Sequence, residues 1–195
     1  LIRRQKELRI EFAQAIVLQE TARAKTLAAH RRLDEADDAE VTRLLSESRK
    51  LQTSVAAETG KAADTLAAIL DEMRNNRVGN ASDLEDAQRK VIDPLNALVP
   101  SQARTGGLLE AAADAERRAR KTPEDVRQAV GEIAAAQREI RRQMETVLSH
   151  MQQIGSRQEV DKELQRILKM SRELMDEIRR AAEEQTGEVF DPESP

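Results

Sequence analysis

The stretch from Pro123 to Ile154 constrains the fold most strongly, because its apolar or uncharged residues recur at alternating steps of four and three. Such spacing keeps one stripe of side chains on a single side of a helix, where it packs lengthwise against another helix. We call such a stripe a seam, and a second seam follows Gly155. The predicted packing and interaction seams are Val126, Val130, Ile133, Gln137, Ile140, Met144, Val147, Met151 and Ile154, then Val160, Leu164, Ile167, Ser171, Leu174 and Ile178.

Gly155 separates the two seams and predicts a long helical hairpin over residues 122–186. Ser156 and Glu159 have the spacing of a capping box, which favours a new helix start directly after Gly155. A bend within one continuous helix is the alternative reading of the same glycine. We hypothesise that Gln137 and Ser171, as polar members of the seams, set the register of this hairpin.

Residues 1–77 predict a first long hairpin, with helices over about 1–33 and 39–75 that carry the same kind of seam. Asp38 is the expected N-cap of the second helix. Ala22, Thr26 and Ala29 are small seam residues that bury little apolar area, so this end should be the weaker one.

Residues 78–121 predict short middle helices and loops. Ser82 and Glu85 form a second possible capping box. The Asp93–Pro94 step predicts a kink or break, because proline removes a helix hydrogen bond. Residues 100–107 contain Pro100, Gly106 and Gly107 and predict a loop. A flexible polar tail is expected over residues 187–195.

The composition fits an all-α, elongated antiparallel bundle or coiled coil with two long hairpins. Charged residues make up 35% of the chain, and Phe12 and Phe190 are its only aromatic residues. The net charge is −4 with both signs interspersed, which predicts no nucleic-acid partner. No run is apolar enough over about 18 residues to span a membrane, so membrane contact is expected only through segments outside this chain.

Catalytic, cofactor and metal sites are not expected. The absence of cysteine excludes disulfides, thiolate metal sites and cysteine nucleophiles. His30 and Asp34 are four residues apart, but one such pair is a weak metal signal, and His150 has no ligand at suitable spacing. Gly106-Gly107 lacks the Lys-Ser/Thr of a phosphate-binding loop. The sequence therefore predicts a protein that is not an enzyme.

Three strings resemble the helical region of large uncharacterised envelope proteins of planctomycete-like bacteria. They are residues 69–77 (ILDEMRNNR), residues 91–95 (VIDPL) and residues 144–151 (METVLSHM), the last followed by a QEVxxxLxxIL pattern. The resemblance covers about residues 1–186. It implies a long helical segment of a larger, membrane-anchored protein of the cell envelope, and it carries over no catalytic residues.

These observations predict a non-catalytic helical spacer, scaffold or protein–protein interaction segment of a larger bacterial protein. Its expected partner is another protein, or a second copy, held through helix seams. Two alternatives stay open. One is an amphipathic bundle that binds lipid or a membrane surface, and the other is a signalling helical hairpin. A cytoplasmic location is as compatible with the composition as the cell envelope is.

Overall fold

The computed structural model describes residues 2–33, 38–117 and 124–154, and it confirms the all-α helical bundle. The elements are α1 (Ile2–Arg32), α2 (Asp38–Asn75), α3 (Ala81–Ala87), the π-helix η1 (Gln88–Ile92) and α4 (Asp93–Arg117). A further helix covers residues 124–154 and is called helix 124–154. At about 1.5 Å per residue, α2 alone is about 57 Å long.

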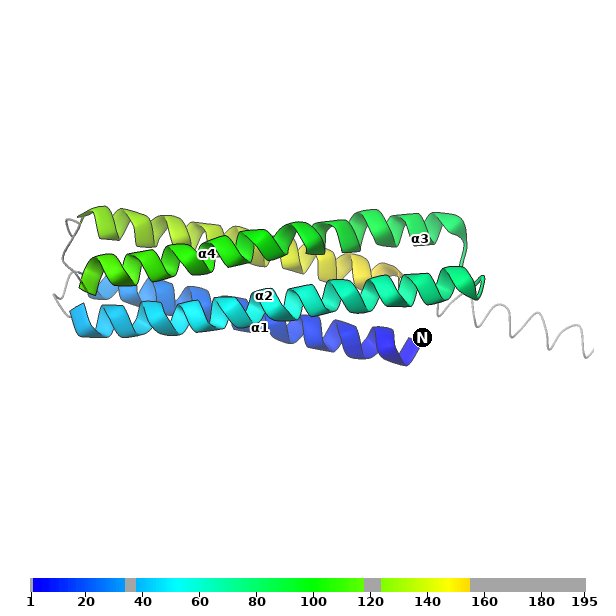
Figure 1. Ribbon diagram of the computed structural model, residues 1–195, viewed down its shortest axis with the longest axis horizontal. Helices are drawn as coiled ribbons and strands as arrows, with labels where there is room; N and C mark the ends of the chain where they lie inside the picture. The colour runs from blue at the N-terminus through cyan, green and yellow to red at the C-terminus, as the bar shows by residue number, and fades with distance from the viewer. Residues whose placement is uncertain (1, 34–37, 118–123, 155–195) are drawn as a thin grey trace, which may run out of the picture. The chain divides into compact units, whose positions relative to one another are not determined.

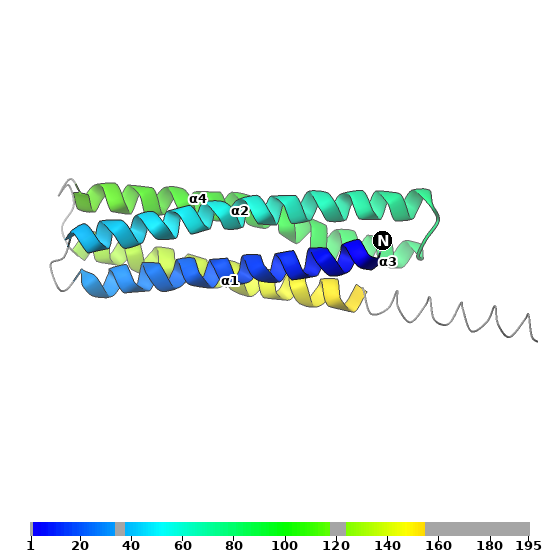
Figure 2. The same ribbon diagram turned by 90° about the horizontal axis from the view of Figure 1, so that it is seen from below.

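Neighbouring long helices run in opposite directions (Figure 1). In each pair of neighbouring helices, the residue numbers of successive contacts increase along one helix and decrease along the other. Helix 124–154 lies beside α1 in Figure 2, and Arg141 contacts Glu20 there at 3.3 Å. The described helices therefore form an up–down–up–down bundle. The contacts that define it are Gln5–Met73, Gln19–Gln52 and Thr26–Ser48 between α1 and α2, and Arg49–Glu110 and Thr59–Gln102 between α2 and α4.

The turn between α2 and α3 uses two residues with positive φ, Arg77 at 52° and Gly79 at 86°. The Val78 N–H donates to the Met73 carbonyl oxygen at 2.9 Å and closes the end of α2. Asn80, and not the predicted Ser82, is the N-cap of α3, because its side-chain oxygen accepts from the Asp83 N–H at 2.8 Å. Asn80 accepts from the amide three residues later, whereas Ser82 as the cap would have accepted from the Glu85 amide.

The loop predicted over residues 100–107 is wrong, since α4 runs unbroken from Asp93 to Arg117 and contains Pro100. Pro100 is exposed, so the carbonyl that lacks its helix partner can face water. Leu98 and Leu109 flank the stretch and are almost completely buried. Their burial stabilises the helical form more than the proline and glycines weaken it.

At Asp93–Pro94, where a kink or a break was predicted, the helix does not break but forms a π-helical turn directly before Asp93. In η1 the Asp93 N–H donates to the Gln88 carbonyl oxygen, five residues back. Pro94 has no N–H, and the Lys90 carbonyl four residues before it lies 3.2 Å from His150 Nδ1 on helix 124–154. The neighbouring helix thus supplies a donor near the point where proline removes one.

The apolar core of the bundle falls into two clusters with buried polar side chains between them. The first cluster includes Phe12, Ile69, Met73 and Leu95 and lies toward the α2–α3 turn. The second includes Ala29, Leu45, Leu109 and Val130 and lies toward the opposite end. The buried polar side chains between and next to the clusters, called the polar section here, are Gln19, Thr26, Ser48, Gln52, Thr59, Gln102, Thr105 and Gln137.

Candidate functional site

The predicted seam of helix 124–154 lies inside this bundle. Its residues from Val126 to Met151 are buried, and Ile154 is half-buried against the first cluster. They pack against α1, α2 and α4 of the same chain, so a partner cannot reach them while the bundle is closed. The other predicted seam residues, Val160, Leu164, Ile167, Ser171, Leu174 and Ile178, lie outside the described residues.

Gln137 joins helix 124–154 to α2 through the polar section. Its Nε2 donates to Ser48 Oγ and to Gln52 Oε1, both at 3.2 Å. Gln52 also exchanges two hydrogen bonds with Gln19 of α1, at 2.9 and 3.2 Å. Our hypothesis paired Gln137 with Ser171 across a terminal hairpin. Ser171 lies outside the described residues, and the hydrogen-bond partners of Gln137 within them are on α2.

Two further groups extend the polar section on either side of Gln52. Ser48 Oγ and Thr26 Oγ1 are 2.8 Å apart, and both donate to the Ala22 carbonyl oxygen. On the other side, Gln102 Nε2 donates to Thr59 Oγ1 at 3.0 Å and contacts the Met144 sulfur at 3.5 Å. The sequence reading placed Gln102 in a loop and so missed it. Its step of seven from Leu95 and from Leu109 was the available signal.

The polar section lowers the stability of the bundle and also favours one alignment of its helices. The Oε1 atoms of Gln102 and Gln137 are buried without a hydrogen-bond partner. Each such atom costs about 1–3 kcal/mol relative to a satisfied one. Polar groups on an otherwise apolar seam lower stability but exclude helix alignments that leave them unpaired. The arrangement therefore favours one register of α1, α2 and helix 124–154.

A groove of about 570 Å³ opens beside η1, lined by Lys90, Pro94, Glu139, Arg142 and His150 among others. Its charges are paired within each helix. Lys90 Nζ is 2.7 Å from Asp86, and Arg142 makes two contacts of 3.0 Å with Glu139. Hydrogen bonds from Lys90 and Arg142 hold the pKa of Asp86 and Glu139 below their usual values. Arg89, which also lines the groove, shares Asp86 with Lys90 at 3.0 Å, so each of these cations has a carboxylate partner while the lining keeps more cations than carboxylates.

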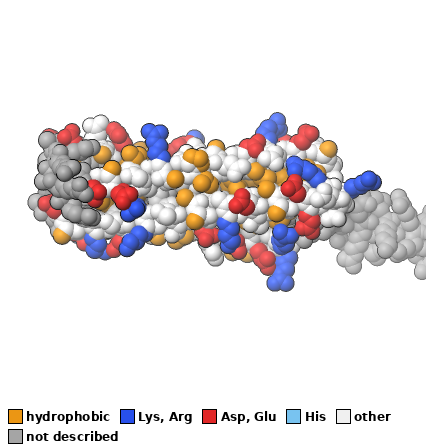
Figure 3. Space-filling model, viewed as in Figure 1, with side chains coloured by type: hydrophobic (Ala, Val, Ile, Leu, Met, Phe, Trp, Pro, Cys, Tyr) orange, Lys and Arg blue, Asp and Glu red, His pale blue; other side chains and the backbone are white. Residues whose placement is uncertain are grey.

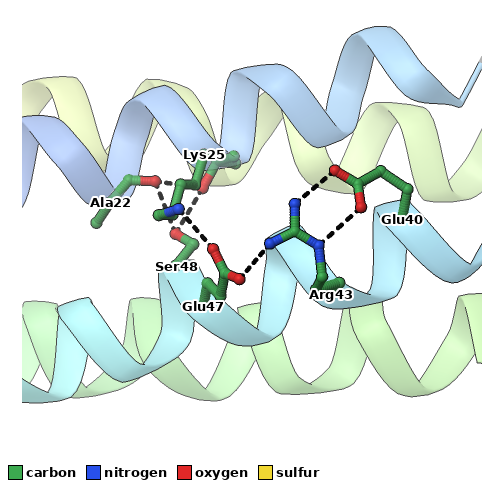
Figure 4. Close-up of polar contacts among 7 residues, drawn as sticks. Ala22, Lys25, Glu40, Arg43, Glu47 and Ser48 are labelled. Atoms are coloured by element: carbon green, nitrogen blue, oxygen red, sulfur yellow. Dashed lines mark hydrogen bonds and ion pairs between the residues drawn. The ribbon is translucent and has the colours of Figure 1, made fainter.

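A chain of charges crosses from α1 to α2 at the other end of the bundle (Figure 4). Lys25 Nζ donates to Glu47 at 2.5 Å, and Arg43 contacts both Glu47 and Glu40. The hydrogen bond from Lys25 is the main cause that lowers the pKa of Glu47, and the one from Arg43 lowers that of Glu40. The chain links the two helices next to the second cluster.

The outer surface of α1 differs from the rest because it presents large apolar side chains to water. Ile10 is 60% exposed and Val17 is 65% exposed, one heptad apart. Leu108 of α4, 45% exposed, is the third large apolar residue exposed among the residues whose burial is described. Figure 3 shows hydrophobic side chains reaching the surface between charged ones on the face in view. Because Ile10 and Val17 share one face of α1, that face is the candidate interaction surface among the described residues.

His30 and His150 do not take part in a metal cluster within the part of the chain that the structure describes, where no group of three His, Cys, Asp or Glu residues converges. Across the same residues, no helix is both long enough and apolar enough to cross a membrane. Comparison of the chain with protein-family models, curated proteins and solved structures finds no match.

Proposed function

We propose that this chain is a non-catalytic protein–protein interaction and scaffold segment of a larger bacterial protein. One observation carries the proposal. The bundle uses its long seams for its own core and still exposes Ile10 and Val17 on one side of α1. Burying a fully exposed side chain of this size is worth about 1.5–3 kcal/mol, and a partner that covers the exposed part of Ile10 and Val17 recovers the corresponding share of that free energy. The resemblance of the three helical strings supports a place in the cell envelope.

Site-specific photo-crosslinking in the native cell tests the proposal. A photoreactive amino acid replaces Val17 on α1, and the matched control replaces Lys50, which is exposed on α2. We expect a discrete adduct with a protein at position 17 and none at position 50. Equal adducts at both positions, no protein adduct at position 17, or adducts with lipid alone would contradict the proposal.

A further inference from the structure

The outer face of α1 carries an apolar row that ends in a cation on each side. Residues seven apart lie on the same face of a helix, displaced by two turns. Starting from Arg3, this step gives Ile10, Val17, Ala24 and Arg31, and all five are exposed. The section from Phe12 to Gln19 contains no charged residue. The row is one side chain wide, a width that suits another helix and not a flat surface.

A groove between α1 and helix 124–154 lies next to this row. It has a volume of about 380 Å³, and Ile10, Ala13 and Leu148 are its apolar lining. The other lining residues are Lys6, Arg9 and Gln152, so both charged side chains in the lining are cations. The grooves along α4 differ, because Glu132 or Glu139 lies in each of them. The α1 groove therefore joins an apolar floor to a cationic rim.

The charge of α1 opposes that of the whole chain. Residues 2–32 contain eight lysines and arginines and three glutamates, a net charge of +5, whereas the chain carries −4. An acidic partner is attracted to such a helix at distances up to the Debye length of about 8 Å at physiological salt. Arg4 and Lys25 of α1 are paired with Glu72 and Glu47 of α2, so part of this charge is neutralised inside the bundle. Pairing α1 with α1 of a second copy would still bring two helices with an excess of cations together. The charge thus selects an acidic occupant over a second copy.

We propose that the α1 face and its groove bind an acidic amphipathic helix of a partner protein. Apolar residues of that helix cover Ile10, Val17 and Leu148, and its carboxylates face Arg9. This inference rests on the proposed function and names the chemistry of the partner.

A designed peptide of three heptads, with leucine in its seam and glutamate at most other positions, provides the probe. Its binding to the full chain is measured by fluorescence anisotropy, beside a peptide in which lysine replaces glutamate. We expect the acidic peptide to bind and the basic one not to bind. The double substitution Ile10→Ser with Val17→Ser should weaken binding of the acidic peptide about tenfold or more. Leu108→Ser, a matched change on α4, should leave it unchanged.

Arg9→Glu should weaken binding of the acidic peptide as well, and the affinity of the unsubstituted chain should fall as salt rises. Circular dichroism on each variant establishes that the bundle is folded. Equal binding of both peptides, or equal loss with Leu108→Ser, would overturn the inference. The inference would also be overturned if the acidic peptide does not bind while the chain binds phosphatidylglycerol vesicles and the Ile10 and Val17 changes abolish that vesicle binding. A protein adduct at position 17 without peptide binding would overturn the acidic partner and leave the proposed function standing.

Discussion

The two apolar clusters share the same four long helices but differ in how they are filled. The first contains large side chains from every helix, among them Phe12, Leu70, Leu95 and Met144. The second relies on alanines in α1 and α4 and on shorter branched residues such as Val126. Larger side chains bury more apolar area and leave larger cavities when they are removed. The first cluster should therefore hold the bundle together while the second opens at lower cost.

The polar section separates the two clusters, so the difference in side-chain size stays confined to the two ends of the bundle. Gln19, Gln52 and Gln137 lie between the clusters, so apolar contacts do not run continuously from one to the other. Stability in such a protein is expected to vary along the bundle, with partial opening at the weaker end. One regular seam pattern therefore supports two unequal halves, since the heptad specifies position and not side-chain volume.

The largest effect is expected from truncating the same residue type in each cluster. Leu98→Ala removes a buried side chain from the first cluster and Leu109→Ala removes one from the second, both in α4. We expect Leu98→Ala to lower the free energy of unfolding by about 3–5 kcal/mol. Leu109→Ala should lower it by about 2–3 kcal/mol, because its alanine-rich surroundings collapse more easily. Urea unfolding measures both, and equal losses would remove the proposed difference between the clusters.

Gln137→Leu tests the separation between the clusters. The substitution removes a buried Oε1 that has no partner, while Gln52 keeps its bonds to Gln19, and Ser48 keeps those to Thr26 and Ala22. We expect the free energy of unfolding to increase by about 1 kcal/mol, which raises the melting temperature. The alignment of the helices should become less well defined.

Spin labels at exposed positions 50 and 138 report that alignment, because the chain has no other cysteines. The distance distribution should broaden in the leucine variant. Gln137→Ala is the control, since it removes volume as well and should lower stability by about 1–3 kcal/mol. A lower melting temperature for Gln137→Leu would show that the amide contributes net stability.

His150→Ala probes how the first cluster is held at η1. It removes the imidazole that lies beside the Lys90 carbonyl oxygen. Pro94, four residues later, has no N–H to donate to that carbonyl. We expect a loss of about 0.5–1.5 kcal/mol and faster amide exchange in α3 and η1 than in α1. His150→Asn, whose amide nitrogen can occupy the place of Nδ1, should restore most of the protection. If both variants exchange like the unsubstituted chain, the contact does not support the π-helix.

The smallest effect concerns the charges beside the second cluster. Because the pKa of Glu47 is lowered by folding, its contribution to stability is present above the usual value of 4.5 and is lost as pH falls through the lowered value. Glu47→Gln should therefore lower the melting temperature at pH 7 by about 1–3 °C. The difference from the unsubstituted chain should vanish at strongly acidic pH. A difference that persists there would point to a cause other than the charge.

Local signals predicted some boundaries and failed at others. Asp38, the expected N-cap, is instead the first residue of α2, and the turn after Asn75 is where Asn and Gly indicated it. The loop predicted over residues 100–107 is wrong, because proline and glycine indicate a loop locally but the burial of Leu98, Gln102 and Leu109 stabilises a helix. Tertiary packing routinely outweighs the propensity of one proline or glycine.

The candidate surface was less predictable than the core. Ile10 and Val17 fall outside the seam of the first helix, and that position alone indicates an outward face. The groove, however, needs Leu148 and Gln152 from helix 124–154, which are more than 130 residues away in the chain. No local pattern states which helix packs beside α1.

The heptad spacing by itself determined that α1, α2 and the stretch 124–154 are helical and which side of each faces inward, but it did not do so for α4. Only the tertiary structure decided that helix 124–154 packs among α1, α2 and α4, with Gln137 bonded to Ser48 and Gln52. The physical reason is that periodicity is a property of one helix, so it fixes where the seam lies. The choice of neighbour depends on volumes and polar groups that meet across helices, and every apolar seam in the chain offers a similar surface.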